Sequence, residues 1–172
     1  MDALTLPWPV VLGSASPRRR EILARIIREF EVDAPDLDED ALTLDDPWQT
    51  ARELARAKAE AIFTRHPDKL VIAGDTVVAV PVGDGFQQLA KPVDRADALR
   101  MLGILQGRQH LVITGICVRW PEGERLFEVT TGVTFHPLDA EQIAAYVDAG
   151  ESMDPTPLKG KRRKSSHQST AR

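Results

Sequence analysis

LVIAGDTVVAV, residues 70–80, is the most apolar stretch of this 172-residue chain. Its side chains are apolar on both alternating faces, which predicts a central β-strand that is covered on both sides. Asp75 is the exception, because a buried carboxylate must be protonated, hydrogen-bonded or paired with a cation. Gly74 before it leaves room for a ligand or another chain segment to approach closely. We therefore interpret Asp75 as a functional residue in preference to a structural one.

Helical and strand patterns alternate on both sides of this strand. Further strands are predicted over 10–12, 30–34, 110–119 and 126–135, and helices over 17–27, 47–65, 95–105 and 141–149. A hairpin turn is expected over 81–86, where glycine and proline interrupt the apolar pattern. This alternation predicts an α/β fold in a chain long enough to bury a core.

The segment GSASPRRR, residues 13–20, joins a predicted strand to a predicted helix. Ser16 suits the N-cap of that helix, and Pro17 suits its first position, where no amide hydrogen is needed. The free amides of a helix N-terminus and the forked guanidinium groups both attract phosphate. Taken alone, the segment fits a phosphate-binding turn and a solvated basic helix start equally well.

Two charged residues between these segments allow a structural and a functional interpretation. Glu39 lies in the acidic loop 35–40, which is explained most simply as a solvated turn. The alternative is that one carboxylate of this loop reaches a divalent metal, because hard cations prefer oxygen ligands. Lys58 lies at the margin of the apolar stripe of the helix over 47–65. Its ammonium group could extend to water or into a cleft.

In the second half of the chain, Lys91 and His110 also allow a structural or a functional interpretation. Lys91 precedes Pro92, which favours extended backbone, and from there the lysine could point back across the hairpin towards Asp75. His110 has no cysteine or histidine nearby at the spacing of a metal site, so a structural role is favoured for it.

Composition limits the classes of protein to consider. The single cysteine, Cys117, cannot form an internal disulfide and suggests a reducing compartment. No signal peptide or run of membrane-spanning length is evident, so a soluble, cytoplasmic protein without a membrane partner is expected. The net charge is −4, but the last 18 residues carry six basic and no acidic side chains, which leaves −10 for residues 1–154. An acidic body does not suggest a nucleic-acid-binding protein.

The segment 155–172 differs from the rest of the chain. It is basic, polar and almost free of apolar residues, so it is expected to be disordered. Its KRRK sequence, residues 161–164, resembles a nuclear-targeting or polyanion-binding patch, and weak nucleic-acid binding would be confined to it. Two parts are therefore predicted, residues 1–154 and a tail over 155–172.

Several motifs occur here in the order found in a known family. They are LGSASPRR (12–19), DE (38–39), ARAKA (55–59), GDTVV (74–78), KP (91–92), LQGRQHLVITG (105–115) and YVDAGESMD (146–154). Over roughly residues 9–154 the chain resembles the Maf family of nucleoside triphosphate pyrophosphatases. The ordered series is far more specific than any one of its motifs.

The resemblance implies a Maf/ITPase-like fold, in which a mixed, twisted sheet with flanking helices forms two lobes around a central cleft. It also implies a divalent metal (Mg or Mn) and, in many members, a homodimer. The implied reaction converts a nucleoside triphosphate to the monophosphate and pyrophosphate, a house-cleaning role directed at dTTP, UTP and modified pyrimidine nucleotides. A sister branch prefers 7-methyl-GTP, but the motifs look more like those of the pyrimidine branch.

The resemblance also implies roles for individual residues. Asp75 matches the proton acceptor and a metal position, and Glu39 matches the acidic residue on the metal side. Arg19 and Thr76 match positions linked to the choice of base. The positions that match the phosphate cleft are Ser14, Arg18, Arg19, Lys58 and Lys91.

The resemblance ends abruptly after Asp154, because residues 155–172 match nothing in the closing segment of the family. A nucleotide-binding protein with weak or no catalysis is therefore kept as an alternative to an active enzyme. An interaction protein acting through the basic tail is a third possibility. A nucleotidyltransferase is disfavoured, because the glycine-rich nucleotide loop expected of one is not found.

Overall fold

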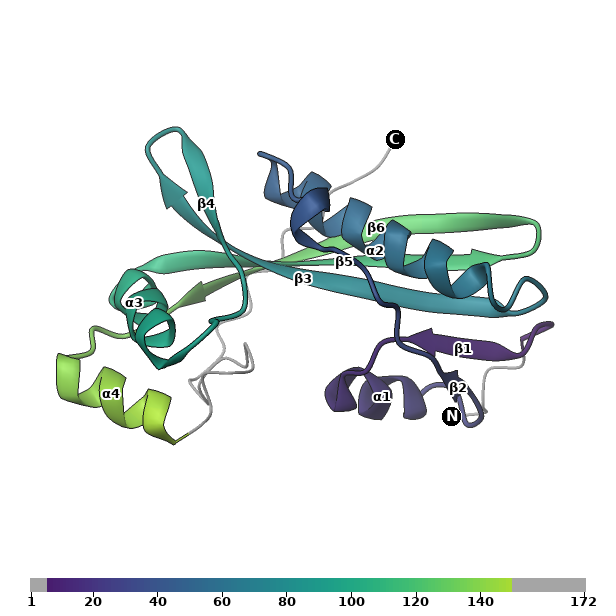
Figure 1. Cartoon of the computed structure of the whole chain (residues 1–172), viewed down its shortest axis with the longest axis horizontal. Coiled ribbons are helices and arrows are strands. Elements are labelled where there is room, and N and C mark those ends of the chain that lie inside the picture. Colours follow the sequence, from purple (N-terminus) through teal and green to yellow (C-terminus); the bar gives the residue numbers. More distant parts are fainter. Residues whose placement is uncertain (1–5, 150–172) are drawn as a thin grey trace. The chain divides into compact units, whose positions relative to one another are not determined.

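The computed structural model describes residues 6–149, which divide into two compact units (Figure 1). Unit 1 combines residues 6–90 with 105–137, and unit 2 combines 91–104 with 138–149. Two units agree in number with the two lobes that the resemblance implies. The predicted disorder of 155–172, and the predicted boundary at residue 154, concern residues outside the described part.

Unit 1 is built on a mixed six-stranded sheet, which confirms the predicted α/β class (Figure 1). Its strands are β1 (Val10–Gly13), β2 (Glu31–Val32), β3 (Leu70–Val82), β4 (Gly85–Leu89), β5 (Gln109–Trp120) and β6 (Gly123–Thr134). The order is β2-β1-β3-β5-β6, and β4 also pairs with β3. β1 is parallel to β2 and β3, whereas the β3–β4, β3–β5 and β5–β6 pairs are antiparallel. The apolar stretch 70–80 is thus the central strand, as predicted.

Helix α2 (Pro47–Phe63) covers one face of this sheet. Asp46 caps it, because its carboxylate accepts hydrogen bonds from the amides of Trp48 (2.8 Å) and Gln49 (3.2 Å). The buried stripe of α2 packs against β1, β3 and β5, and Cys117 of β5 belongs to the same core. Burial raises the pKa of the Cys117 thiol to about 11, so this cysteine is protonated and is not a candidate nucleophile.

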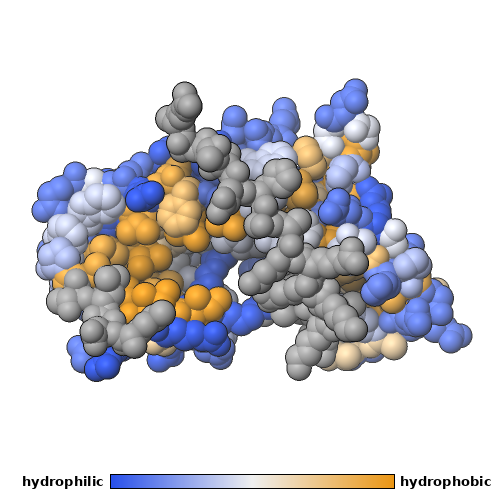
Figure 2. Space-filling view, turned by 180° about the vertical axis from the view of Figure 1, so that it is seen from behind, coloured by the Kyte–Doolittle hydropathy of each residue, from blue (hydrophilic) through white to orange (hydrophobic). Residues whose placement is uncertain are grey.

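Helix α1 (Pro17–Ala24) is shorter than the predicted helix over 17–27. Ser16 occupies the N-cap position, as predicted, although its hydroxyl makes no capping hydrogen bond. Leu23 is buried, whereas Ile22 and Ile26 are 58% and 56% exposed. These two isoleucines line a cavity of about 220 Å³ between α1 and the sheet. Figure 2 shows hydrophobic residues gathered on this part of unit 1, at the left of the view.

Unit 2 contains most of α3 (Arg95–Leu105) and α4 (Ala140–Asp148). A capping box between Asp139 and Gln142 begins α4. Arg95 donates two hydrogen bonds to the Asp148 carboxylate, at 2.7 and 3.0 Å, and so links the two helices. None of the helices within residues 6–149 combines the length and apolar character required to cross a bilayer.

Candidate functional site

Strands β1 and β4 pair with different parts of the same edge of the central strand β3, and a short stretch of β3 lies between those two parts. β1 pairs with β3 from Leu70 to Ala73, and β4 pairs with it from Val78 onward. Within the described part of the chain, no strand is paired to that edge between these two partners, from Gly74 to Val77. We call residues 74–77 the open segment of β3. Because side chains alternate along a strand, Asp75 and Thr76 extend to opposite faces of the sheet here.

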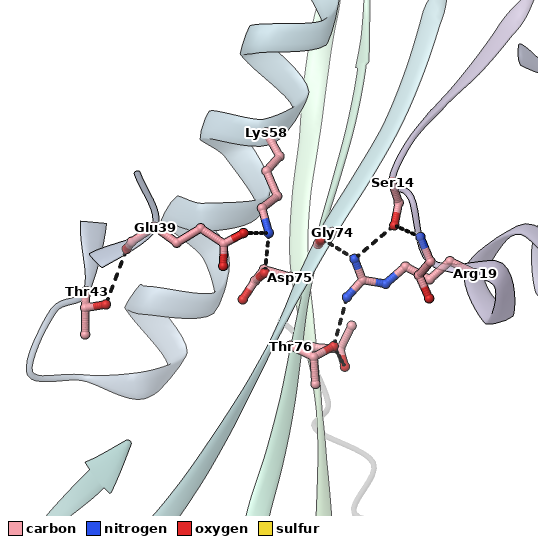
Figure 3. A network of polar contacts seen from close by, with 10 residues as sticks. Ser14, Arg19, Glu39, Thr43, Lys58, Gly74, Asp75 and Thr76 are labelled. Atoms are coloured by element: carbon pink, nitrogen blue, oxygen red, sulfur yellow. Dashed lines mark hydrogen bonds and ion pairs between the residues drawn. The ribbon is translucent and has the colours of Figure 1, made fainter. Parts of the chain in front are cut away.

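On the α2 face of the open segment, a lysine bridges two carboxylates (Figure 3). Lys58 Nζ of α2 lies 2.6 Å from Asp75 Oδ1 and 2.8 Å from Glu39 Oε1. The side chains of Lys58 and Asp75 are each 12% exposed, whereas that of Glu39, just before the short helix η1 (Asp40–Leu42), is 50% exposed. The lysine is therefore the cation that the buried carboxylate requires. Glu39 is thus an ion-pair partner of Lys58, and its predicted role towards a metal stays a prediction.

On the other side of the open segment, the turn between β1 and α1 is bound to β3 (Figure 3). Arg19 Nη1 donates to the Gly74 carbonyl at 2.5 Å, and Nη2 donates to Thr76 Oγ1 at 3.1 Å. Ser14 Oγ accepts from the Ser16 amide at 3.2 Å and from Arg19 Nη1 at 3.5 Å. The Arg19 guanidinium thus extends along the edge of β3 where β1 has already ended.

The carboxylates on the α2 face influence the pKa of Arg19 on the other side of the open segment. Burial lowers the pKa of the Arg19 guanidinium, and the carboxylates of Asp75 and Glu39 oppose this shift by attraction. An arginine remains charged under these conditions. The open segment therefore has a fixed positive charge on one face and a lysine held between two carboxylates on the other, which suits a ligand that carries both phosphates and a counter-cation.

The structure brings together six of the eight predicted site residues in unit 1. They are Ser14, Arg19, Glu39, Lys58, Asp75 and Thr76. Arg18, also in unit 1, is half-buried in the first turn of α1, directly before Arg19. Lys91 belongs to unit 2, so its predicted approach to Asp75 stays a prediction.

Comparison with known proteins identifies the family. The sequence profile described as "Maf-like protein" matches residues 9–156, most of the chain. This chain belongs to the Maf family.

Relatives of this Maf chain include several named dTTP/UTP pyrophosphatases. The protein of that name from Sphingopyxis alaskensis is 47% identical over 146 residues, covering 84% of this chain and 74% of the relative. The one from Symbiobacterium thermophilum is 43% identical over 145 residues, covering 84% and 73%. Among solved structures, the Ham1 protein of Staphylococcus aureus is similar at 18% identity and a TM-score of 0.49, covering 72% of this chain and 70% of that chain.

The predicted divalent metal can be tested against the acidic residues of this Maf chain. Residues 6–149 contain no group of three or more histidine, cysteine, aspartate or glutamate side chains that could hold an ion by themselves. Glu39 and Asp75 nevertheless converge on one point, the Lys58 ammonium, at 2.8 and 2.6 Å. Magnesium commonly takes one or two carboxylates and completes its shell with water and substrate phosphates. The two carboxylates therefore fit an ion that is held jointly with a triphosphate.

Two residues of β5 were not singled out from the sequence of this Maf chain, although they lie beside the open segment. Gly115 pairs with Asp75, and Thr114 pairs with Thr76. Both lie in the predicted strand over 110–119. A glycine inside an otherwise apolar strand is the one local signal that could have drawn attention to this position.

We expect Lys58→Met to lower the free energy of unfolding by about 1–3 kcal/mol, because it leaves the buried Asp75 carboxylate without its cation. Urea unfolding measures the change. Lys69→Met is the matched control, since Lys69 Nζ pairs at 2.6 Å with Glu31, whose side chain is 57% exposed. Its loss should cost about 1 kcal/mol or less. Equal losses in both variants would contradict the role of Lys58 as the partner of a buried charge.

Proposed function

We propose that this chain hydrolyses nucleoside triphosphates to nucleoside monophosphate and pyrophosphate, a house-cleaning activity directed at dTTP, UTP and modified pyrimidine nucleotides. The observation that carries the proposal is the buried Asp75 carboxylate, paired with Lys58 in the open segment of β3 and adjacent to the Arg19 turn. The names of the relatives support the choice of substrate. The residues beside the open segment supply the charges that such a substrate requires.

Phosphoryl chemistry needs positive charge against the phosphate oxygens and a well-positioned water more than it needs covalent catalysis. In the proposed complex, Arg18 and the N-terminal amides of α1 bind phosphate oxygens, with Ser14 as an additional hydrogen-bonding group. Arg19 contributes its charge from the edge of β3, where its contact with Gly74 fixes it. Lys58 donates to the phosphates from the α2 face. Lys91 stays a predicted phosphate-cleft residue, as the family resemblance implies.

Asp75 is proposed to accept the proton of the attacking water. Lys58 donates to Asp75 Oδ1 at 2.6 Å, which fixes the carboxylate in one orientation while leaving it acceptor capacity for a water molecule. Glu39 and Asp75 are the residues that would hold a divalent ion, Mg or Mn. When bound, such an ion supplies positive charge against the phosphate oxygens and acidifies water. The proton acceptor in this scheme remains Asp75.

Two further assignments belong to the proposal. Arg19 and Thr76, hydrogen-bonded to each other at 3.1 Å, are proposed to contact the base. Residues 1–154 are proposed as the catalytic part, and 155–172 as a separate tail. A homodimer and a cytoplasmic location stay predictions, as does weak nucleic-acid binding by the tail.

A pyrophosphate-release assay tests the proposal. The full chain is mixed with magnesium and each of dTTP, UTP, CTP, ATP, GTP and 7-methyl-GTP, and pyrophosphate is measured alongside the nucleoside monophosphate. We expect equal amounts of both products, with the highest rates for dTTP and UTP. Release of orthophosphate, or no product from any nucleotide by folded protein, would overturn the proposal. Thermal stabilisation by nucleotide without product would favour the alternative of a binding protein.

A further inference from the structure

The hydroxyl of Thr76 has a second neighbour besides Arg19. Thr76 on β3 and Thr114 on β5 are directly paired across the sheet, and their Oγ1 atoms lie 3.1 Å apart. Thr114 also lines the cavity of about 220 Å³ together with Arg19 and Gly74, whereas all the other lining residues are aliphatic. Thr114 therefore lies in the wall of a cavity, next to a residue of the candidate site.

Hydrogen-bond counting limits what the Thr76 hydroxyl can offer to a ligand. A hydroxyl has one hydrogen to donate and two lone pairs that accept. Arg19 Nη2 donates to Thr76 Oγ1 at 3.1 Å, and a guanidinium cannot accept, so one lone pair of Thr76 is always occupied. The second lone pair and the hydrogen remain, and the contact with Thr114 uses one of them, depending on which hydroxyl donates.

Two arrangements of the threonine pair are possible. If Thr114 donates to Thr76, both lone pairs of Thr76 are filled, and Thr76 can present only its hydrogen to a ligand. If Thr76 donates to Thr114 instead, Thr76 can present only a lone pair. The first arrangement selects a ligand group that accepts, such as a carbonyl oxygen, and the second selects a group that donates, such as an amino group.

We propose that Thr114 is a positioning residue that donates to Thr76 and so makes the Thr76 hydroxyl a donor to a base carbonyl. This inference rests on the proposed function, in which Thr76 contacts the base. Uracil and thymine carry a carbonyl oxygen where cytosine carries an amino group. Thr114 would therefore contribute to selecting UTP and dTTP over CTP, without contacting the nucleotide itself.

The test compares Thr114→Val with Thr114→Ser. Valine keeps the shape and the strand preference of threonine but removes the hydroxyl, whereas serine keeps the hydroxyl. We expect Thr114→Val to lower the ratio of kcat/KM for UTP to that for CTP by about tenfold, because the freed Thr76 hydroxyl can then turn to accept from an amino group. Thr114→Ser should restore most of the ratio. Melting temperatures of both variants identify any general loss of folding.

The outcomes separate this inference from the proposed function. An active wild-type chain and a folded, active Thr114→Val variant with an unchanged UTP-to-CTP ratio would overturn the role of Thr114 and leave the proposed function intact. If Thr114→Val does not fold, Thr114→Ala takes its place, because it also removes the hydroxyl, and an unchanged ratio in that folded variant would overturn the inference. If wild type is inactive, calorimetric titration compares UTP with CTP by the ratio of their dissociation constants, which Thr114→Val should shift in favour of CTP. Failure to bind either nucleotide would overturn both proposals.

Discussion

Asp75→Asn should reduce the rate of pyrophosphate release from dTTP or UTP by about 10²–10⁴-fold, the usual contribution of a general base. The amide has nearly the shape of the carboxylate but cannot accept the proton of an attacking water. It also removes one of the two carboxylates that converge on Lys58, so the dependence of the residual rate on magnesium should weaken. Steady-state kinetics over a range of magnesium concentrations measure both effects.

The stability of Asp75→Asn distinguishes a catalytic loss from unfolding. Lys58 keeps Glu39 at 2.8 Å in this variant, so the ammonium is not left alone, and the variant should remain folded. Asp84→Asn is the matched control, because Asp84 is an exposed carboxylate in the turn between β3 and β4. It should change neither rate nor melting temperature. An Asp75→Asn variant with the full wild-type rate would remove Asp75 from the proposed chemistry.

Gly115→Ala should be strongly destabilising, since among the described glycines this position has the closest backbone contact for an added Cβ. A Cβ atom at this position would lie 2.0 Å from the Ala51 carbonyl oxygen of α2 and 2.9 Å from the Arg52 amide nitrogen. Backbone cannot move aside as a flexible side chain can, so α2 would have to shift away from the sheet. We expect a loss of about 3 kcal/mol or more, the upper end of overpacking costs, and a fall in melting temperature of roughly 10 °C.

The same substitution should also reduce activity, because Gly115 pairs with Asp75 and α2 carries Lys58. Gly103→Ala is the matched control. A Cβ at Gly103 meets no atom within 4 Å, and the residue lies in helix α3, where alanine is favoured over glycine by up to about 1 kcal/mol. Thermal and urea unfolding of the two variants should therefore give effects of opposite sign. A Gly115→Ala variant as stable as wild type would contradict the close contact between α2 and β5.

Residues 13–20 show which features can be predicted from local sequence and which cannot. The strand and the helix on either side of residues 13–20 follow from apolar spacing and from Pro17, and both are present. Ser16 occupies the predicted N-cap position without a side-chain cap, and its amide donates to Ser14 Oγ, a contact that the sequence pattern did not predict. The local pattern does not distinguish Arg19 from the two arginines beside it; the family resemblance did, and in the structure Arg19 contacts Gly74 and Thr76. These contacts lie 55 and 57 residues along the chain, beyond any local pattern.

The sequence by itself determined the central strand and the need of the Asp75 carboxylate within it for a partner. The apolar pattern of residues 70–80 requires burial on both faces, and a carboxylate buried there requires a proton, a hydrogen bond or a cation. Both conclusions depend only on neighbouring residues and on the free energy of transferring a charge out of water. The order of motifs also indicated the Maf family, to which the chain belongs.

Only the tertiary structure showed that Lys58 meets Asp75. The sequence was compatible with Lys58, Lys91 or a metal, and the packing of α2 on β3 and β5 brings Lys58 to 2.6 Å, whereas the approaches of Lys91 and of a metal stay predictions. The same holds for the open segment of β3, which exists because β1 ends at Gly13 and β4 begins to pair only at Val78. Strand register and helix packing depend on contacts between distant residues, and the spacing of residues along one segment contains no information about them.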